Sequence, residues 1–129
     1  MRKWGIPAAC LPIFVGAAVA GTPAHYLDEQ RCLAVLNIAA AAFSTIEEPG
    51  HALHALREDV ENGYGRLKIL IAAERDLTDQ QIDKGLDVFD GEQQHWLDAF
   101  GDAHEEQARN MVLEVLMKKA RHCVKELPG

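Results

Sequence analysis

The side chains best suited to metal chemistry in this sequence are its six histidines. His51 and His54 are three residues apart and Glu58 follows four residues later, so all three would lie on one side of a helix. Imidazole and carboxylate groups are ordinary zinc ligands. That side, however, lies roughly 100–160° from the apolar line of the same helix. We therefore expect three solvent-exposed residues without a fourth ligand, and assign no metal site to them.

A second pair, His25 and His122, is the haem candidate of this sequence. His25 precedes the first predicted helix and His122 stands beside Cys123 near the end of the last one, so the two could approach at one end of a helical bundle. The chain has no C-x-x-C-H segment for covalent haem attachment. We expect two separate histidines and no bound cofactor, with haem binding kept as part of the alternative function below.

Arrangements for covalent or acid–base catalysis are missing from the sequence. Ser44 is the only serine, and it lacks the glycine pattern of a nucleophile elbow. There is no glycine-rich phosphate loop and no dinucleotide fingerprint. The carboxylates are spread along helical patterns as solvated surface groups. The protein is therefore expected not to be an enzyme.

Composition and charge narrow the class of partner. The 129 residues are 48% hydrophobic and 26% charged, which is typical of one small globular domain. The formal charge is −7, and without residues 1–20 it becomes −9, with 11 basic against 20 acidic residues. Nucleic acids and anionic membranes require a basic surface, so both are excluded as expected partners.

The first 20 residues have the three parts of a secretory signal peptide. Arg2 and Lys3 are followed by an apolar run, and Ala18-Val19-Ala20 is a small-x-small cleavage sequence. Pro7 and Pro12 interrupt the run, which argues against a membrane anchor. We predict cleavage near Ala20, a mature domain over 21–129, and a periplasmic or secreted location.

Cleavage would remove Cys10 and leave Cys32 and Cys123. Two cysteines in an exported chain predict one disulfide bond between them. The alternative, a pair of thiolates for metal or redox chemistry, lacks support because no CxxC spacing occurs.

Apolar residues recur every three or four positions from Tyr26 onward, which indicates helices and no strands. The first two predicted inward faces are Cys32, Val35, Leu36, Ala39, Phe43 and Ile46, and then Leu53, Leu56, Val60, Tyr64, Leu67 and Ile71. Glu48-Pro49-Gly50 separates these helices, and Pro49 suits the first turn of the second. The second helix is expected to continue through Gly63 and Gly65.

Thr78 and Gln81 form a capping-box sequence, so a third helix should begin at Asp79. Its predicted face is Ile82, Leu86, Phe89, Gln93, Trp96 and Phe100, and we expect it to continue through Gly91. The fourth helix has the predicted face Ala108, Met111, Val112, Val115, Leu116, Lys119 and Cys123. Basic residues in its last turns suit the negative end of the helix dipole.

Short connections between successive helices favour antiparallel neighbours. The predicted fold is therefore all-α, an up-down-up-down four-helix bundle closed by one disulfide, Cys32–Cys123. In this topology the two cysteines lie at the same end of adjacent helices. The topology predicted from helical periodicity is therefore consistent with the disulfide predicted from export.

The segment Leu77-Thr78-Asp79-Gln80-Gln81 is similar to the L-T-x-x-Q motif of small helical periplasmic stress chaperones. That resemblance would imply a protective role in the periplasm. The capping box accounts for the same residues, and no family is assigned on them.

The function predicted from the sequence is that of a small exported, non-catalytic binding protein. An acidic surface favours a basic protein partner, in the role of an inhibitor, a toxin-immunity protein or a stress-related protein. The expected contact residues are Trp96, His95, Asp98, Asp102 and Glu105, although Trp96 also suits the core. The alternative function is a haem- or metal-binding four-helix bundle carrier, and the sequence leaves the partner's identity and the oligomeric state open.

Overall fold

The computed structural model describes residues 21–45 and 50–127, except for the side chains of 51–53. The predicted signal peptide over 1–20 lies outside these residues, as do the predictions for Ile46 and Pro49. Four α-helices follow one another in this part of the chain, and no strand is found in it. They are α2 (Ala24–Phe43), α3 (His51–Ala73), α4 (Asp79–Asp102) and α5 (Glu106–Lys125). The predicted all-α class is confirmed.

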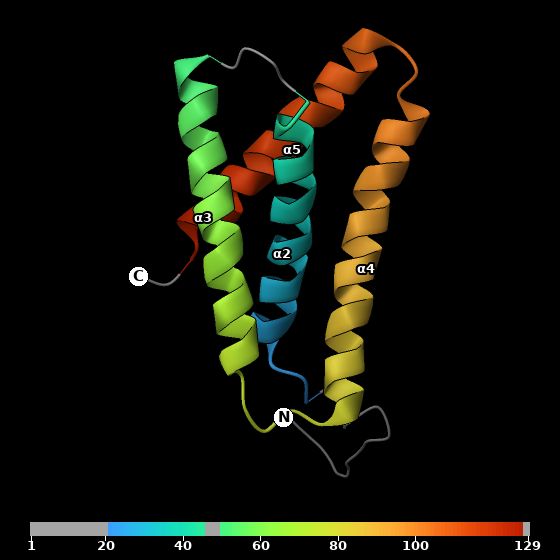
Figure 1. Ribbon diagram of the computed structural model, residues 1–129. Coiled ribbons are helices and arrows are strands. Elements are labelled where there is room, and N and C mark those ends of the chain that lie inside the picture. Colours follow the sequence, from blue (N-terminus) through green and yellow to red (C-terminus); the bar gives the residue numbers. More distant parts are fainter. Residues whose placement is uncertain (1–20, 46–49, 128–129) are drawn as a thin grey trace, which may run out of the picture.

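The helices form an up-down-up-down bundle (Figure 1). Helices α2, α3 and α4 run side by side, whereas α5 crosses them obliquely (Figure 1). Cys32 and Cys123 form the predicted disulfide, with their Cα atoms 5.6 Å apart, well within the range that a disulfide spans. Because α2 begins at Ala24, Cys32 lies in its third turn. The oblique path of α5 brings Cys123 to that level.

Helix α2 is the centre of the bundle. It contacts α3, α4 and α5, whereas α3 and α4 do not contact each other along their described ranges. The sequence of α2 suits this position because it is rich in alanine, which lets neighbouring backbones approach. Ala34, Leu36 and Ala39 are completely buried although they lie on different sides of the helix. From Leu33 to Phe43 the helix is apolar on nearly all sides, and a helix with this composition is normally found inside a protein.

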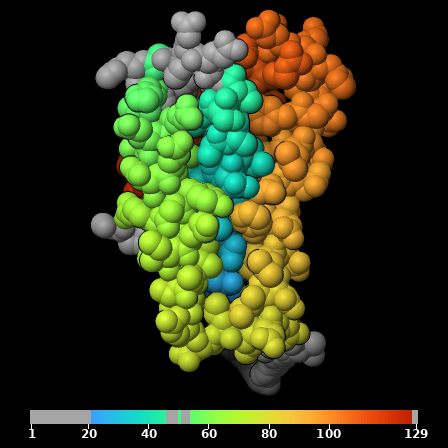
Figure 2. Space-filling model, in the orientation of Figure 1, coloured from blue at the N-terminus to red at the C-terminus, as the bar shows by residue number. Residues whose placement is uncertain are grey.

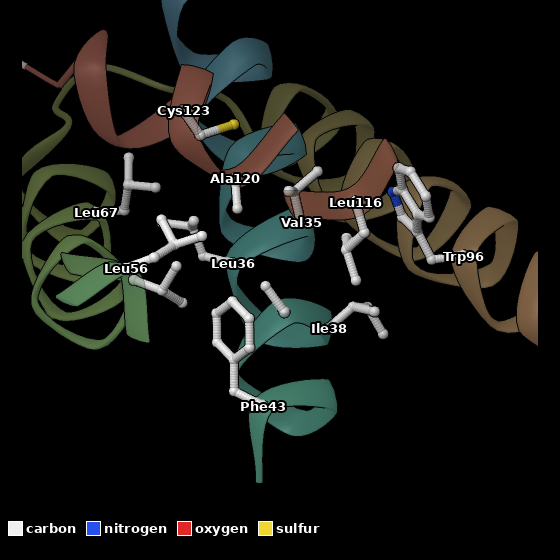
Figure 3. Packing of buried hydrophobic residues seen from close by; sticks show 12 residues of the cluster. Val35, Leu36, Ile38, Phe43, Leu56, Leu67, Trp96, Leu116, Ala120 and Cys123 are labelled. Atoms are coloured by element: carbon white, nitrogen blue, oxygen red, sulfur yellow. The ribbon is translucent and has the colours of Figure 1, made fainter. Parts of the chain in front are cut away.

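The hydrophobic core lies where α3, α4 and α5 pack on α2. Leu36 of α2, Leu56 and Leu67 of α3 and Ala120 of α5 point toward one another in Figure 3. Gly63 is buried in the middle of α3, and a Cβ there would lie 3.3 Å from the Leu36 side chain. Helix α3 is continuous through this glycine, as predicted. The missing side chain allows α3 to pack closely on α2 at this point.

Helix α4 begins at the residue predicted from its cap. The Thr78 hydroxyl accepts a hydrogen bond from the Gln81 backbone N–H at 3.1 Å, and the Gln81 side-chain oxygen accepts one from the Thr78 N–H at 2.9 Å. Both arms of the capping box are therefore present. The helix is continuous through Gly91, also as predicted.

The inward faces of α4 and α5 differ from those predicted. Ile82 and Leu86 are 39% and 50% exposed, and Met111 and Val115 are 64% and 52% exposed. The buried residues of these helices are Gly85 and Trp96 of α4 and Leu116, Ala120 and Cys123 of α5. The predicted faces were wrong at these four positions because each helix has more apolar residues than its contact with α2 covers, and Lys119, also placed on the inward face of α5, is exposed. Small residues, Gly85 and Ala120, mark the true contact faces.

None of the four helices in the described ranges is long and apolar enough to cross a lipid bilayer.

Candidate functional site

A pocket of about 500 Å³ lies beside the disulfide, between the first half of α2 and the end of α5. Its walls include Cys32 and Cys123, the apolar side chains of Val35 and Leu67, and the polar side chains of His25, Asp28, Glu29, Arg31, Lys119, His122 and Glu126. The volume is within the range of small-ligand pockets. The disulfide joins α2 and α5, the two helices that supply most of the pocket walls.

Three potential metal ligands meet at the edge of this pocket. His25 and Glu29 lie four residues apart in the first turns of α2, and Glu74 directly follows α3. Each contributes one donor atom, and these three atoms all lie within 4.8 Å of one another. The His25 Nε2 atom is 3.2 Å and 3.1 Å from the two Glu74 carboxylate oxygens. We refer to His25, Glu29 and Glu74 as the His-Glu-Glu cluster.

Glu29 is a partly buried member of the cluster. Its Oε1 atom is buried and has no hydrogen-bond partner among the described residues. Burial raises the pKa of this carboxyl above its ordinary value, the nearby His25 lowers the pKa, and the negative charge of Glu74 raises it further. The net effect is that the carboxylate form of Glu29 is disfavoured in the folded protein.

The histidines singled out from the sequence lie in two places. His54 and Glu58 are 3.8 Å apart on α3, with side chains 60% and 66% exposed, as expected. His51 is the first residue of α3, and its side chain is outside the described part. His25 and His122 both line the pocket beside the disulfide. Haem binding between them stays a prediction.

The contact region predicted around Trp96 is divided between core and surface. Trp96 is 3% exposed and belongs to the core, where its Nε1 atom donates a hydrogen bond to Glu92 at 2.8 Å. Its burial is at odds with a role as a contact residue. His95, Asp98, Asp102 and Glu105 are exposed, and His95 packs edge-on against the Trp96 ring. These four residues remain predicted contacts.

Helix α4 instead exposes a different apolar surface. We define its apolar stripe as Ile82, Leu86, Phe89 and Leu97, whose spacing of four, three and eight residues places them on one side of the helix. Leu86 and Leu97 are each 50% exposed, and Phe89 is half-buried. The same side of α4 approaches α2 through a 2.8 Å hydrogen bond from Asn37 to Gln93. Figure 2 shows α2 at the surface between α3 and α4.

An acidic stripe runs beside the apolar one. We define it as the exposed residues Asp79, Asp83, Asp87, Asp90 and Asp98. Helix α4 contains seven acidic residues and a single lysine, Lys84. Much of the negative charge of the chain is therefore concentrated on one helix next to exposed apolar side chains.

The sequence could have indicated part of the His-Glu-Glu cluster, because a histidine and a glutamate four residues apart share one side of a helix. Nothing in the sequence connects Glu74 with them, since it lies 45 residues beyond Glu29. The exposed apolar stripe was also missed, because periodicity alone predicts that such residues are buried.

Comparison of this chain with family models, with curated proteins and with solved structures found no match.

Proposed function

We propose that the protein is a small exported binding protein without catalytic activity, and that α4 recognises a basic protein partner. The observation that carries this proposal is the pairing of the apolar stripe with the acidic stripe on α4. The roles that fit such a surface are those of an inhibitor, a toxin-immunity protein or a stress-related protective protein.

The exposed apolar side chains supply the contact area. Isolated exposed leucines are common on protein surfaces, but Ile82, Leu86 and Phe89 occupy successive turns of one helix. An amphipathic helix lying against a neighbouring helix uses contacts with this spacing.

The acidic stripe determines the charge of the partner. Asp79, Asp83 and Asp87 repeat at every fourth position, so they form a row on consecutive turns. Such a row attracts a segment rich in lysine or arginine and speeds its association. The partner we infer is therefore an amphipathic segment with a basic face, carried by another protein.

The disulfide supports the proposed location. Disulfides form and persist mainly in oxidising compartments such as the periplasm or the extracellular space. Cys32–Cys123 therefore favours export, in agreement with the signal peptide expected over 1–20.

A capture experiment with matched variants tests the proposal. The mature protein, immobilised with its disulfide intact, is exposed to envelope extract of its host at low salt. We expect one basic protein to be retained and to be released at high salt, because screening weakens the contact with the acidic row.

Leu86→Lys and the double variant Asp83→Lys, Asp87→Lys should lower the affinity for this protein at least tenfold. Ile69→Lys is the control, because Ile69 is 70% exposed on α3 and outside the stripe. Equal retention by all variants, or no retention at low salt, would refute a role for α4 in binding.

A further inference from the structure

We propose that the His-Glu-Glu cluster binds a divalent transition-metal ion, with Zn²⁺ as the ion that its donor set fits best. The proposal is independent of the α4 surface and of the partner it recognises.

The three donors are close to the geometry that zinc requires. Zinc binds histidine nitrogen and carboxylate oxygen at about 2.0–2.2 Å, so neighbouring ligand atoms in a tetrahedral site are roughly 3.4 Å apart. His25 and Glu74 already satisfy this separation, at 3.1 Å. Glu29 lies within 4.8 Å of both, so an adjustment of roughly 1.4 Å at most completes the set. A change of side-chain rotamer in a glutamate covers that distance.

The charges of the cluster also favour a cation. Glu29 and Glu74 place two carboxylates next to a histidine that is neutral in its metal-binding form. Without an ion, the two carboxylates repel each other, and the buried Glu29 Oε1 atom has no hydrogen-bond partner in the described part of the chain. A buried, unpaired carboxylate oxygen is costly, and a divalent ion would both pair with it and cancel the repulsion.

The ligand types distinguish between ions. Magnesium and calcium prefer sites made of oxygen atoms alone, whereas imidazole suits zinc and its neighbours in the first transition row. His25 has a side chain that is 62% exposed, so an ion can reach the cluster from solvent. Three protein ligands leave a fourth position for water or for a small molecule in the adjoining pocket.

His54 and Glu58 provide an internal comparison. They repeat the four-residue spacing of His25 and Glu29 on an exposed stretch of α3. Across the described ranges, the His-Glu-Glu cluster is the one place where three such donors converge. The third ligand, Glu74, comes from the residue that follows α3, and its presence distinguishes the cluster from an ordinary surface ion pair.

Calorimetric titration of the untagged protein with zinc chloride tests the proposal. We expect one ion per chain, with binding to magnesium at least a hundredfold weaker. His25→Ala, Glu29→Gln and Glu74→Gln should each weaken zinc binding at least tenfold. His54→Ala and Glu58→Gln are matched controls and should bind zinc like the unmodified protein.

NMR of the unmodified protein gives a second measurement that does not depend on any variant. Addition of one equivalent of zinc should shift the imidazole resonances of His25 and leave those of His54 unchanged. The proposal is wrong if zinc fails to saturate at one ion per chain. It is also wrong if His122→Ala abolishes binding while Glu74→Gln does not, because the ion would then lie elsewhere in the pocket.

Discussion

Gly85 of α4 lies directly against the aromatic ring of Tyr26 of α2. A Cβ atom at position 85 would be 2.5 Å from the Tyr26 Cε2 atom and 2.8 Å from its hydroxyl oxygen. Tyr26 is 3% exposed, and its hydroxyl accepts a hydrogen bond from Gln30. The missing side chain of Gly85 therefore allows α4 to pack on the central helix.

Gly85→Ala should destabilise the protein although alanine is the better helix former. Overpacking costs about 1–3 kcal/mol, whereas the gain in helix propensity is about 1 kcal/mol. We expect a net loss of up to about 2 kcal/mol in the free energy of unfolding, measured by urea denaturation. Gly91→Ala is the control, because no atom lies within 4 Å of a Cβ there. It should stabilise the protein by up to about 1 kcal/mol, and similar effects of the two changes would contradict this account.

Removal of the disulfide should be among the most damaging single changes. The bond joins residues 91 positions apart. In the chain-entropy model, closing such a loop lowers the entropy of the unfolded chain and so stabilises the folded state by about 4–5 kcal/mol. We expect the Cys32→Ala, Cys123→Ala double variant to lose about 2–5 kcal/mol in the free energy of unfolding. Urea denaturation with and without a reductant measures it. A reductant that left the urea midpoint of the unmodified protein unchanged would argue against the bond.

Thr78→Ala should lower the free energy of unfolding by about 1 kcal/mol, because it removes the oxygen that caps the Gln81 N–H. For a domain of this size the melting temperature should fall by about 4–8 °C. Gln80→Ala is the control, since Gln80 is exposed in the same turn and does not take part in the capping box. Equal melting temperatures for Thr78→Ala and Gln80→Ala would show that the cap is unimportant.

Glu29 should make stability depend on pH. Its pKa in the folded protein is raised above the ordinary value of 4.5, chiefly by burial, so the folded state holds the proton more tightly than the unfolded state. The free energy of unfolding therefore falls as the pH rises from 4.5 through the folded-state pKa, and the loss is complete above it.

Glu29→Gln removes this penalty. Without added metal, the variant should be more stable than the unmodified protein at pH 7, and the difference should shrink as the pH falls to 4.5 and below. Thermal melts across this pH range measure it, with the exposed Glu58→Gln as the control. A variant that is less stable at pH 7 would mean that His25 stabilises the charged carboxylate more than burial destabilises it.

Several features of the fold could be predicted from local sequence. The cap at Thr78 placed the start of α4 correctly, because its hydrogen bonds join residues three positions apart. The disulfide followed from the expected number of cysteines and from helix directions, and the structure brings Cys32 and Cys123 together. The exposure of His54 and Glu58 followed from helical periodicity.

Other features depend on packing between helices, which periodicity does not describe. The sequence predicted one inward face for the first helix, but α2 is central and also buries Tyr26, Gln30 and Ile38 on its other sides. Ile82 and Leu86 were expected in the core and are exposed instead, because contact with Tyr26 turns Gly85 toward α2.

By itself, the sequence determined the helical class, the up-down order of the helices and the pairing of the two cysteines, since each depends on local spacing or simple connectivity. Only the tertiary structure decided which faces meet, which apolar residues stay exposed on α4, and that Glu74 joins His25 and Glu29. The physical reason is that these properties arise from how the surfaces of separate helices fit together. Side chains 45 residues apart become neighbours through that fit, and no local pattern in the chain records it.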